Sequence, residues 1–245
     1  MPKPSQPREP HDVVAIRREV EKALNLHDGQ GRVTGNAKWG AYCFYDYDGE
    51  PIYVGQTSEQ LRVRVRRHVT NQRTDAVAMS VLDPFEVCWI EMWPLWDLQS
   101  VNNRSSPKDI FRAAQDQLSA LEYTVVRHVL ESSALGAVLN EKDVSPTDLI
   151  ALPPSTKARI IPPAIYEQRR HSDIRIARRA STIAALAKVI SERAVSPGLR
   201  RTLLTQAQRL EMLARARFEE LRGAIPVEAP GEQNGETLWG DAEVL

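Results

Sequence analysis

The amino-acid sequence predicts an α+β fold in which a small three-stranded antiparallel sheet is flanked by helices. Three segments rich in aromatic and β-branched residues predict the strands: residues 39–45, 51–55 and 84–93. The first two segments enclose the stretch DYDGE, whose Asp and Gly residues are typical of a β-hairpin turn. The other predicted elements show helical spacing of their apolar residues, so helices should cover this sheet.

Helices are predicted over residues 11–26 and 57–72, on either side of the hairpin. In each helix, apolar side chains recur every three or four residues, so that one face can pack on the sheet. These side chains are Val13, Ile16, Val20, Leu61, Val65 and Val69. Between the first helix and the first strand, residues 27–38 are polar and rich in glycine and should form a loop.

A longer helix is expected after the third strand, from Pro107 to about Leu130. Ser106 is placed to cap its N-terminus, Pro107 suits the first helical position, and Asp109 faces the positive end of the helix dipole. By the same reasoning, the stretch SPTD at residues 145–148 predicts the start of a short helix.

The C-terminal part is predicted to be a helical hairpin. Residues 153–163 contain four prolines and predict a linker. Two apolar stripes at helical spacing follow, and a Ser-Pro-Gly break at residues 196–198 separates them, so the two helices should pack antiparallel. The stripes are Ile176, Ala180, Ile183, Ala187 and Ile190 in the first helix, and Leu203, Ala207, Leu210, Ala214 and Leu221 in the second.

These elements divide the chain into four expected parts. Residues 1–35 hold the N-terminal helix and loop, and residues 36–152 form the core. Residues 153–222 comprise the linker and the basic helical hairpin. The acidic tail, residues 223–245, and the proline-rich residues 1–10 are expected to be disordered.

Charge is distributed unevenly along the chain, although its 32 basic and 32 acidic side chains cancel. Residues 157–222 hold 15 Lys and Arg against 6 Asp and Glu. The first 156 residues hold 17 against 21, and residues 223–245 hold five acids and no Lys or Arg. The basic block suits an anionic partner such as nucleic acid, and a solvated helical face is the alternative.

Composition excludes several classes of protein. No apolar run approaches the roughly 18 residues that a membrane span needs. The N-terminal residues lack the apolar segment of a secretory signal. Two cysteines, Cys43 and Cys88, are too few for a disulfide framework or a four-cysteine zinc site. We therefore expect a reduced, soluble, cytoplasmic protein.

Four polar side chains are expected near one face of the sheet. Whether residues 47–48 or 48–49 form the hairpin turn, the period of two places Tyr42 and Tyr53 on the same side. In the following helix, Arg64 and His68 are four residues apart and share a face beside the apolar stripe. Taken singly, these pairs are more typical of core packing and of a basic helix surface.

Together these residues belong to a longer pattern of motifs. Gly40-Ala41-Tyr42 is followed by Tyr53-Val54-Gly55, and then by Gly-Gln-Thr-x3-Leu-x2-Arg-x3-His, which ends at His68. Glu122 follows in the long predicted helix, and Asn140 follows in the stretch Val-Leu-Asn. Over residues 39–142, this order resembles the GIY-YIG nuclease superfamily, with Ala41 in place of the usual isoleucine.

The resemblance implies a nuclease that cleaves phosphodiester bonds by in-line attack of water, with one divalent metal ion, Mg²⁺ or Mn²⁺. It also implies a set of roles for the matching residues. Glu122 would bind the metal, and Arg64 would bind the phosphate. Tyr42 and His68 would activate the water, and Tyr53 would orient water or phosphate. Asn140 would be a structural or positioning donor.

Absent features narrow the kind of nuclease. There are too few cysteines for the zinc fingers of some homing endonucleases of the superfamily, and we see no helix-hairpin-helix repeat like that of its excision-repair member. The compact layout resembles stand-alone type II restriction endonucleases, which would cut double-stranded DNA as a symmetric homodimer. A structure-specific or phage/mobile-element nuclease, and a DNA-binding module without catalysis, are the alternatives. The basic hairpin could bind DNA or mediate assembly.

Overall fold

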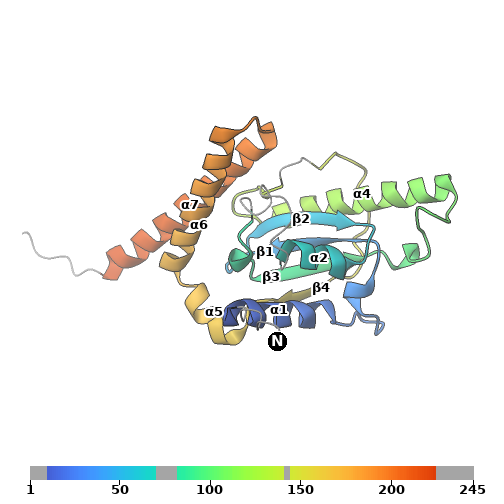
Figure 1. Cartoon of the computed structure of the whole chain (residues 1–245), viewed down its shortest axis with the longest axis horizontal. Helices are drawn as coiled ribbons and strands as arrows, with labels where there is room; N and C mark the ends of the chain where they lie inside the picture. The colour runs from blue at the N-terminus through green and yellow to red at the C-terminus, as the bar shows by residue number, and fades with distance from the viewer. Residues whose placement is uncertain (1–9, 70–81, 141–143, 225–245) are drawn as a thin grey trace, which may run out of the picture.

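The computed structural model describes residues 10–69, 82–140 and 144–224. Its centre is an antiparallel sheet of four strands with the order β2-β1-β3-β4. Figure 1 shows helices on both sides of this sheet and two long helices at one end of it. The predicted α+β class is therefore confirmed, with one strand more than expected.

The strands are β1 (Gly40–Tyr45), β2 (Pro51–Thr57), β3 (Trp89–Pro94) and β4 (Thr156–Arg159). The helices are α1 (His11–Leu24), α2 (Leu61–Val69), α4 (Lys108–Glu131), α5 (Pro163–Arg169), α6 (Ser172–Glu192) and α7 (Pro197–Ala224). Short 3-10 helices are η1 (Thr34–Asn36), η2 (Pro84–Glu86) and η3 (Trp96–Leu98). Residues 1–9, 70–72 and 225–245, for which the sequence also makes predictions, lie outside the described residues. No described helix is long and apolar enough to cross a membrane.

The fourth strand lies in the segment that its prolines predict to be a linker. β4 pairs with β3 from Trp89 opposite Arg159 to Met92 opposite Thr156. The prolines at residues 153–154 and 162–163 flank the strand, so its own four residues keep the backbone N–H groups that a sheet requires. The linker prediction is wrong for these four residues.

Two predicted helix starts also differ from the structure. Residues 145–148 form no helix. The nearby Ile150 N donates to Thr124 Oγ1 of α4 at 3.1 Å, and the prolines at 153–154 leave no room for further helical turns. The Ser106 hydroxyl accepts from Asn102 N at 3.0 Å instead of capping α4, which begins at Lys108.

Strand β1 lies at the centre of two hydrophobic cores. All six of its residues are buried. Tyr42 and Phe44 pack with residues of α1 and α2, whereas Ala41, Cys43 and Tyr45 pack with residues of α4. This alternation follows from the period of two along a strand, and it explains why a short, wholly apolar strand can support helices on both faces.

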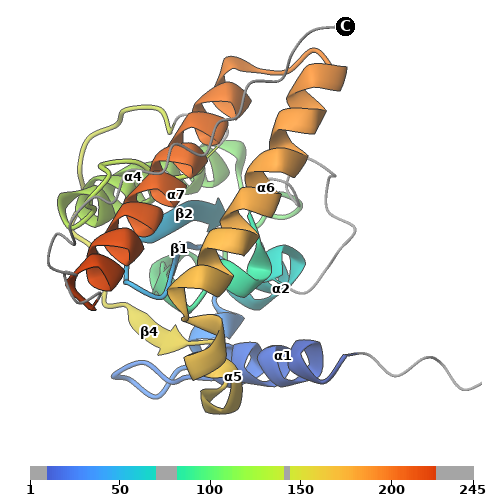
Figure 2. The ribbon, with the colours of Figure 1, turned by 90° about the vertical axis from the view of Figure 1, so that its left-hand side faces the viewer.

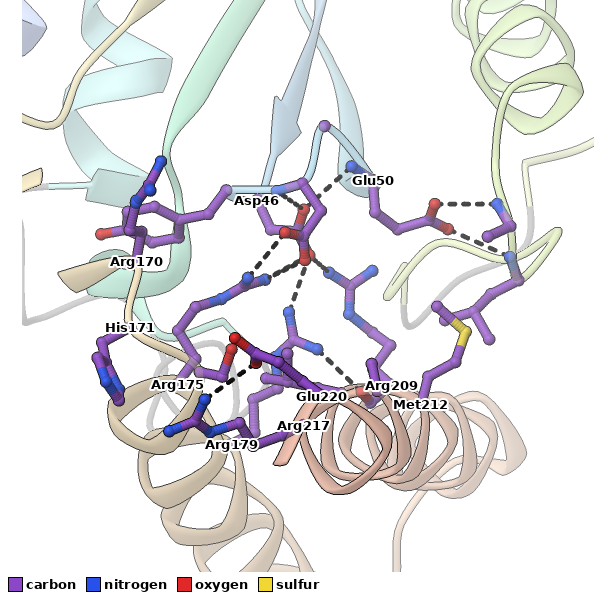
Figure 3. A pocket seen from close by; sticks show the side chains of 18 of the residues that line it. Asp46, Glu50, Arg170, His171, Arg175, Arg179, Arg209, Met212, Arg217 and Glu220 are labelled. Carbon is purple, nitrogen blue, oxygen red and sulfur yellow. Dashed lines mark hydrogen bonds and ion pairs between the residues drawn. The ribbon is translucent and has the colours of Figure 1, made fainter. Parts of the chain in front are cut away.

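The helical hairpin is joined to the core by a buried cluster of charges. Asp46, the first residue after β1, accepts hydrogen bonds at Oδ2 from Arg175, Arg179 and Arg209 at 3.3, 2.8 and 2.6 Å (Figure 3). These four side chains are at most 7% exposed. Asp46 Oδ1 also accepts from the backbone N of Asp48 in the β1–β2 turn at 2.9 Å, so a single carboxylate binds the turn and both hairpin helices together.

Ion pairs with the core use much of the positive charge of the basic segment. Its arginines reach acidic side chains of α1, of the β1–β2 turn and of the segment around η2. The pairs are Arg169 with Asp12, Arg175 with Asp48, Arg178 with Asp83 and Arg179 with Glu86. The sequence suggests that this basic block binds nucleic acid or forms a solvated helical face. Neither interpretation includes ion pairs between its arginines and the core.

Helices α6 and α7 lie side by side and run antiparallel, as predicted (Figure 2). The face of α6 that is buried is not the predicted apolar stripe. Arg175, Arg179 and Leu186 are buried, whereas Ile176 is partly buried and Ala180 is exposed. The prediction of the buried face is wrong because paired arginines can occupy buried positions that an apolar pattern assigns to aliphatic residues.

Replacing Asp46 by Asn should destabilise the protein by about 3–5 kcal/mol, because three buried guanidinium groups lose their shared carboxylate while the turn keeps an acceptor. Asp48→Asn is the matched control, since the Asp48 side chain is 62% exposed and its loss should cost about 1 kcal/mol or less. Urea denaturation measures both changes. Equal losses for the two variants would contradict the assigned importance of Asp46.

Candidate functional site

Tyr42, Tyr53 and His68 lie together on one face of the sheet. The ring centroids of Tyr42 and Tyr53 are 6.3 Å apart. The centroid of the His68 ring lies 5.9 Å from that of Tyr42 and 5.3 Å from that of Tyr53. Tyr42 is opposite Gly55 in the β1–β2 register, and Tyr53 is opposite Phe44. The structure therefore brings together the two phenols and the imidazole that the sequence places on adjacent elements.

Gly55 provides the space for the Tyr42 ring. A Cβ atom at Gly55 would lie 2.6 Å from Tyr42 Cζ and 2.9 Å from Tyr53 Cε1. Any side chain there would displace one or both phenols, so the last position of the Tyr-Val-Gly motif has a direct steric reason to be glycine.

Arg64 is the arginine of α2 that faces the two phenols. Burial lowers the pKa of Arg64, but the nearby Tyr42 and Tyr53 side chains raise it by more, so that its pKa lies above the usual value. The neighbouring arginines are directed elsewhere: Arg62 donates to Asn25 Oδ1, Arg66 pairs with Glu21, and Arg67 pairs with Glu59. This arrangement agrees with the choice of Arg64 that the motif spacing favours.

Glu122 approaches the same region from α4, which packs against β1 and β2. Burial raises the pKa of Glu122 to about 7, and the nearby Arg64 only partly opposes this effect. The carboxylate forms no hydrogen bond or ion pair with any described residue. Binding a cation would favour its ionised form again.

Three buried polar atoms in this region lack a hydrogen-bond partner among the described residues: Tyr42 Oη, Arg64 Nε and His68 Nε2. Unpaired buried polar groups are costly, and they suit a region that binds a polar ligand or ordered water. Within the described ranges no group of three or more His, Cys, Asp and Glu side chains could hold a metal ion. Glu122 would then be the protein's carboxylate ligand in a metal site completed by water and phosphate, a donor set that fits Mg²⁺.

Burial sets the protonation states of the three rings. It raises the pKa of Tyr42 and of Tyr53, so both phenols stay protonated at neutral pH. Burial and the adjacent Arg64 lower the pKa of His68 to about 4, so its imidazole is neutral. A neutral imidazole can accept a proton, whereas a phenol can do so only if it passes its own proton on.

Asn140 has a different environment from the other five candidates. Its Nδ2 donates to Val54 O at 2.7 Å, and its Oδ1 accepts from Val54 N at 3.1 Å. The neighbouring Leu139 N donates to Ile52 O at 2.7 Å. The amide thus pairs with the free edge of β2, and this geometry favours the structural one of its two suggested roles.

The structure also reveals polar residues that the motif pattern omits. Gln56, Gln115 and Ser119 line a cavity of about 320 Å³ that Arg64 borders as well. Gln56 Oε1 is buried and has no partner among the described residues. The sequence holds a signal for part of this set, because Gln115 and Ser119 precede Glu122 by seven and three residues and so share its helix face.

Comparison with known proteins identifies the domain that holds this site. Residues 38–100 match the family model of the GIY-YIG catalytic domain. The matched segment contains Tyr42, Tyr53, Arg64 and His68 and ends before Glu122. No curated protein and no solved structure matches the chain. The motif order, the arrangement of the site and the family match agree, and they assign the domain around residues 38–100 to the GIY-YIG nuclease superfamily.

Proposed function

We propose that this nuclease is a divalent-metal-dependent DNA endonuclease and that it acts as a type II restriction enzyme on double-stranded DNA. The observation that carries the proposal is the convergence of unpaired polar groups from β1, α2 and α4 on one region. The residues assigned to catalysis are Tyr42, Tyr53, Arg64, His68 and Glu122, with Asn140 as a structural support of β2.

Arg64 binds the scissile phosphate. Its guanidinium remains charged at any working pH and presents several N–H donors to phosphate oxygens. Because Nε is buried and has no partner among the described residues, an entering phosphate oxygen satisfies a donor that is otherwise unpaired. The same contact strengthens as negative charge grows during attack, which is the requirement for lowering the reaction barrier.

Tyr42 and His68 take the proton of the attacking water. Tyr42 Oη accepts this proton while its own passes to the imidazole, directly or through Tyr53, and neutral His68 receives it at Nε2. The anionic phosphate nearby favours the protonated imidazole and so aids the transfer. Water attacks opposite the leaving 3′-oxygen, and the products carry a 5′-phosphate and a 3′-hydroxyl.

Glu122 holds the metal ion. When bound, Mg²⁺ or Mn²⁺ stabilises negative charge on the phosphate and on the leaving oxygen. The Glu122 carboxylate forms no ion pair with the Arg64 guanidinium in the described structure, although Arg64 lies near enough to lower the pKa of Glu122. The two groups are therefore free to bind different parts of the substrate complex.

A restriction enzyme must cut both strands, and a homodimer would supply the second site by symmetry. Helix α7 exposes Leu204, Phe218 and Leu221, which could contribute an apolar contact between copies. Incubation of plasmid DNA with the protein tests this role. Discrete fragments with Mg²⁺, and none with EDTA, support it. Cleavage confined to branched DNA would favour the structure-specific alternative, and binding without cleavage would favour the inactive module.

Glu122→Gln should lower metal-dependent plasmid cleavage by at least about a thousandfold, because the amide is a poor metal ligand, while DNA binding persists. Glu131→Gln is the matched control, since Glu131 is an exposed residue at the end of the same helix. A fixed-time cleavage assay with a parallel binding measurement separates the two effects. Normal cutting by Glu122→Gln would overturn the metal assignment.

Arg64→Gln should reduce the cleavage rate by about a hundredfold or more, because a charged donor to the phosphate is lost. Arg62→Gln provides the comparison on the same helix, since Arg62 is already bonded to Asn25. Single-turnover rates at saturating DNA measure the rate of the cleavage step itself. A larger loss for Arg62→Gln would show that the wrong arginine has been assigned.

Stability in metal-free buffer should reveal the raised pKa of Glu122. Between pH 4.5 and about 7 the unfolded chain releases the Glu122 proton and the folded chain keeps it, so stability from this group falls as pH rises. Glu122→Gln lacks this titration. The free energy of unfolding of the variant should therefore rise, relative to that of the wild type, by about 3 kcal/mol between pH 4.5 and pH 8. Parallel pH profiles of the unfolding free energy for the two proteins would contradict a buried Glu122.

A further inference from the structure

Polar and basic residues continue from Glu122 along α4. At 100° per residue, Lys108, Arg112, Gln115 and Ser119 fall on the side of the helix that also carries Glu122. The buried residues Ala114, Leu118 and Leu121 form the adjoining apolar face. The stripe therefore borders the core on the side of the candidate site, rather than pointing to bulk solvent on the far side of the helix.

The outer part of this stripe is exposed and forms no ion pair within the described part of the chain. Lys108 and Arg112 are exposed, and neither forms a salt bridge with a described residue. Figure 1 shows that the N-terminal turns of α4 continue past the end of β2. This contrasts with α6 and α7, where Arg175, Arg179 and Arg209 are buried in ion pairs with the core.

The inner part of the stripe borders the cavity of about 320 Å³ beside Arg64. Gln115 and Ser119 line it from α4, and Gln56 and Thr57 line it from the end of β2. Its one acidic lining residue, Glu59, is engaged by Arg67 at 3.0 Å. The cavity thus extends from Arg64 to Gln115, which precedes Ser119 on α4 and follows Arg112 by three residues, and it offers neutral hydrogen-bonding groups along the way.

We propose that the substrate DNA strand extends from the scissile phosphate along this side of α4. The nucleotide next to the scissile phosphate occupies the cavity beside Gln115 and Ser119, and Arg112 and Lys108 bind phosphates farther along the same strand. This inference rests on the proposed nuclease site and adds the path of its substrate.

Helix geometry agrees with such a path. Gln115, Arg112 and Lys108 lie about 10, 15 and 21 Å from Glu122 along the helix axis. One strand of B-DNA advances about 3.4 Å per phosphate along its own axis, so the two basic residues can reach phosphates several nucleotides from the cleavage position. Contacts of this kind fix the register of the strand and carry no sequence information of their own.

Salt-dependent binding of a labelled 30-base-pair DNA duplex, measured without divalent metal, tests the outer part of the path. Arg112→Gln should weaken binding and reduce the slope of log K against log salt by about 1, and adding Lys108→Gln should reduce it by about 1 more. Arg127→Gln is the matched control, because Arg127 is exposed on α4 but lies C-terminal to Glu122, at the opposite end of the helix from the stripe. Equal slopes for Arg112→Gln and Arg127→Gln would overturn the path.

Filling the cavity tests its inner part. Gln115 is exposed at the rim, so Gln115→Trp should fold normally, as its unchanged melting temperature would show, and should lower kcat/KM for duplex cleavage at least tenfold. Unchanged kcat/KM would refute the cavity assignment. If the wild-type protein binds DNA and cuts none, the proposed nuclease function fails, and the slope comparison still decides the path. A wild-type protein that binds no DNA overturns both.

Discussion

Strand β1 connects the two parts of the molecule that the sequence separates, because its side chains are buried on both faces and its end is fixed by Asp46. Tyr42 in the middle of the strand enters the candidate site, and Gly55 on the neighbouring strand leaves space for its ring. Just after the strand, Asp46 binds three arginines of the helical hairpin. A shift of β1 would therefore disturb both the candidate site and the contacts of α6 and α7 with the core.

The basic C-terminal segment gains a structural explanation from this arrangement. Much of its charge excess is matched by acidic residues of the core, and the closest pairs lie at buried positions where a lone charge would be very costly. Such pairs specify one arrangement of hairpin and core, since any other leaves arginines unpaired. The crevice of about 760 Å³ between these parts is lined by paired charges, such as Arg217 with Glu220, and neither Arg64 nor Glu122 lines it. DNA contacts are better sought along α4, where basic residues are exposed and unpaired with described residues.

Local patterns explain what could be predicted from the sequence. The β1–β2 hairpin has clear periodicity, so the shared face of Tyr42 and Tyr53 could be inferred before any coordinates. The choice of Arg64 comes from the spacing of the GIY-YIG motif between Leu61 and His68. β4 could not, because four residues between prolines become a strand only through pairing with β3. The buried face of α6 was equally hidden: Arg175 is buried because Asp46 and Asp48, more than 120 residues earlier, lie against it. The cavity residues Gln56, Gln115 and Ser119 belong to no motif, and only the packing of α4 beside β2 brings them to Arg64.

A crystal structure of the protein bound to duplex DNA and Mn²⁺, with the metal located by its anomalous scattering, would test directly whether Glu122 and Arg64 act on one phosphate. If Glu122 holds the metal and Arg64 the phosphate, one Mn²⁺ ion should be bound by the Glu122 carboxylate and by an oxygen of the phosphate that Arg64 contacts, with Tyr42 and His68 on the side of the attacking water. Mn²⁺ and the nearest phosphate bound elsewhere, with Glu122 and Arg64 untouched by either, would contradict this assignment.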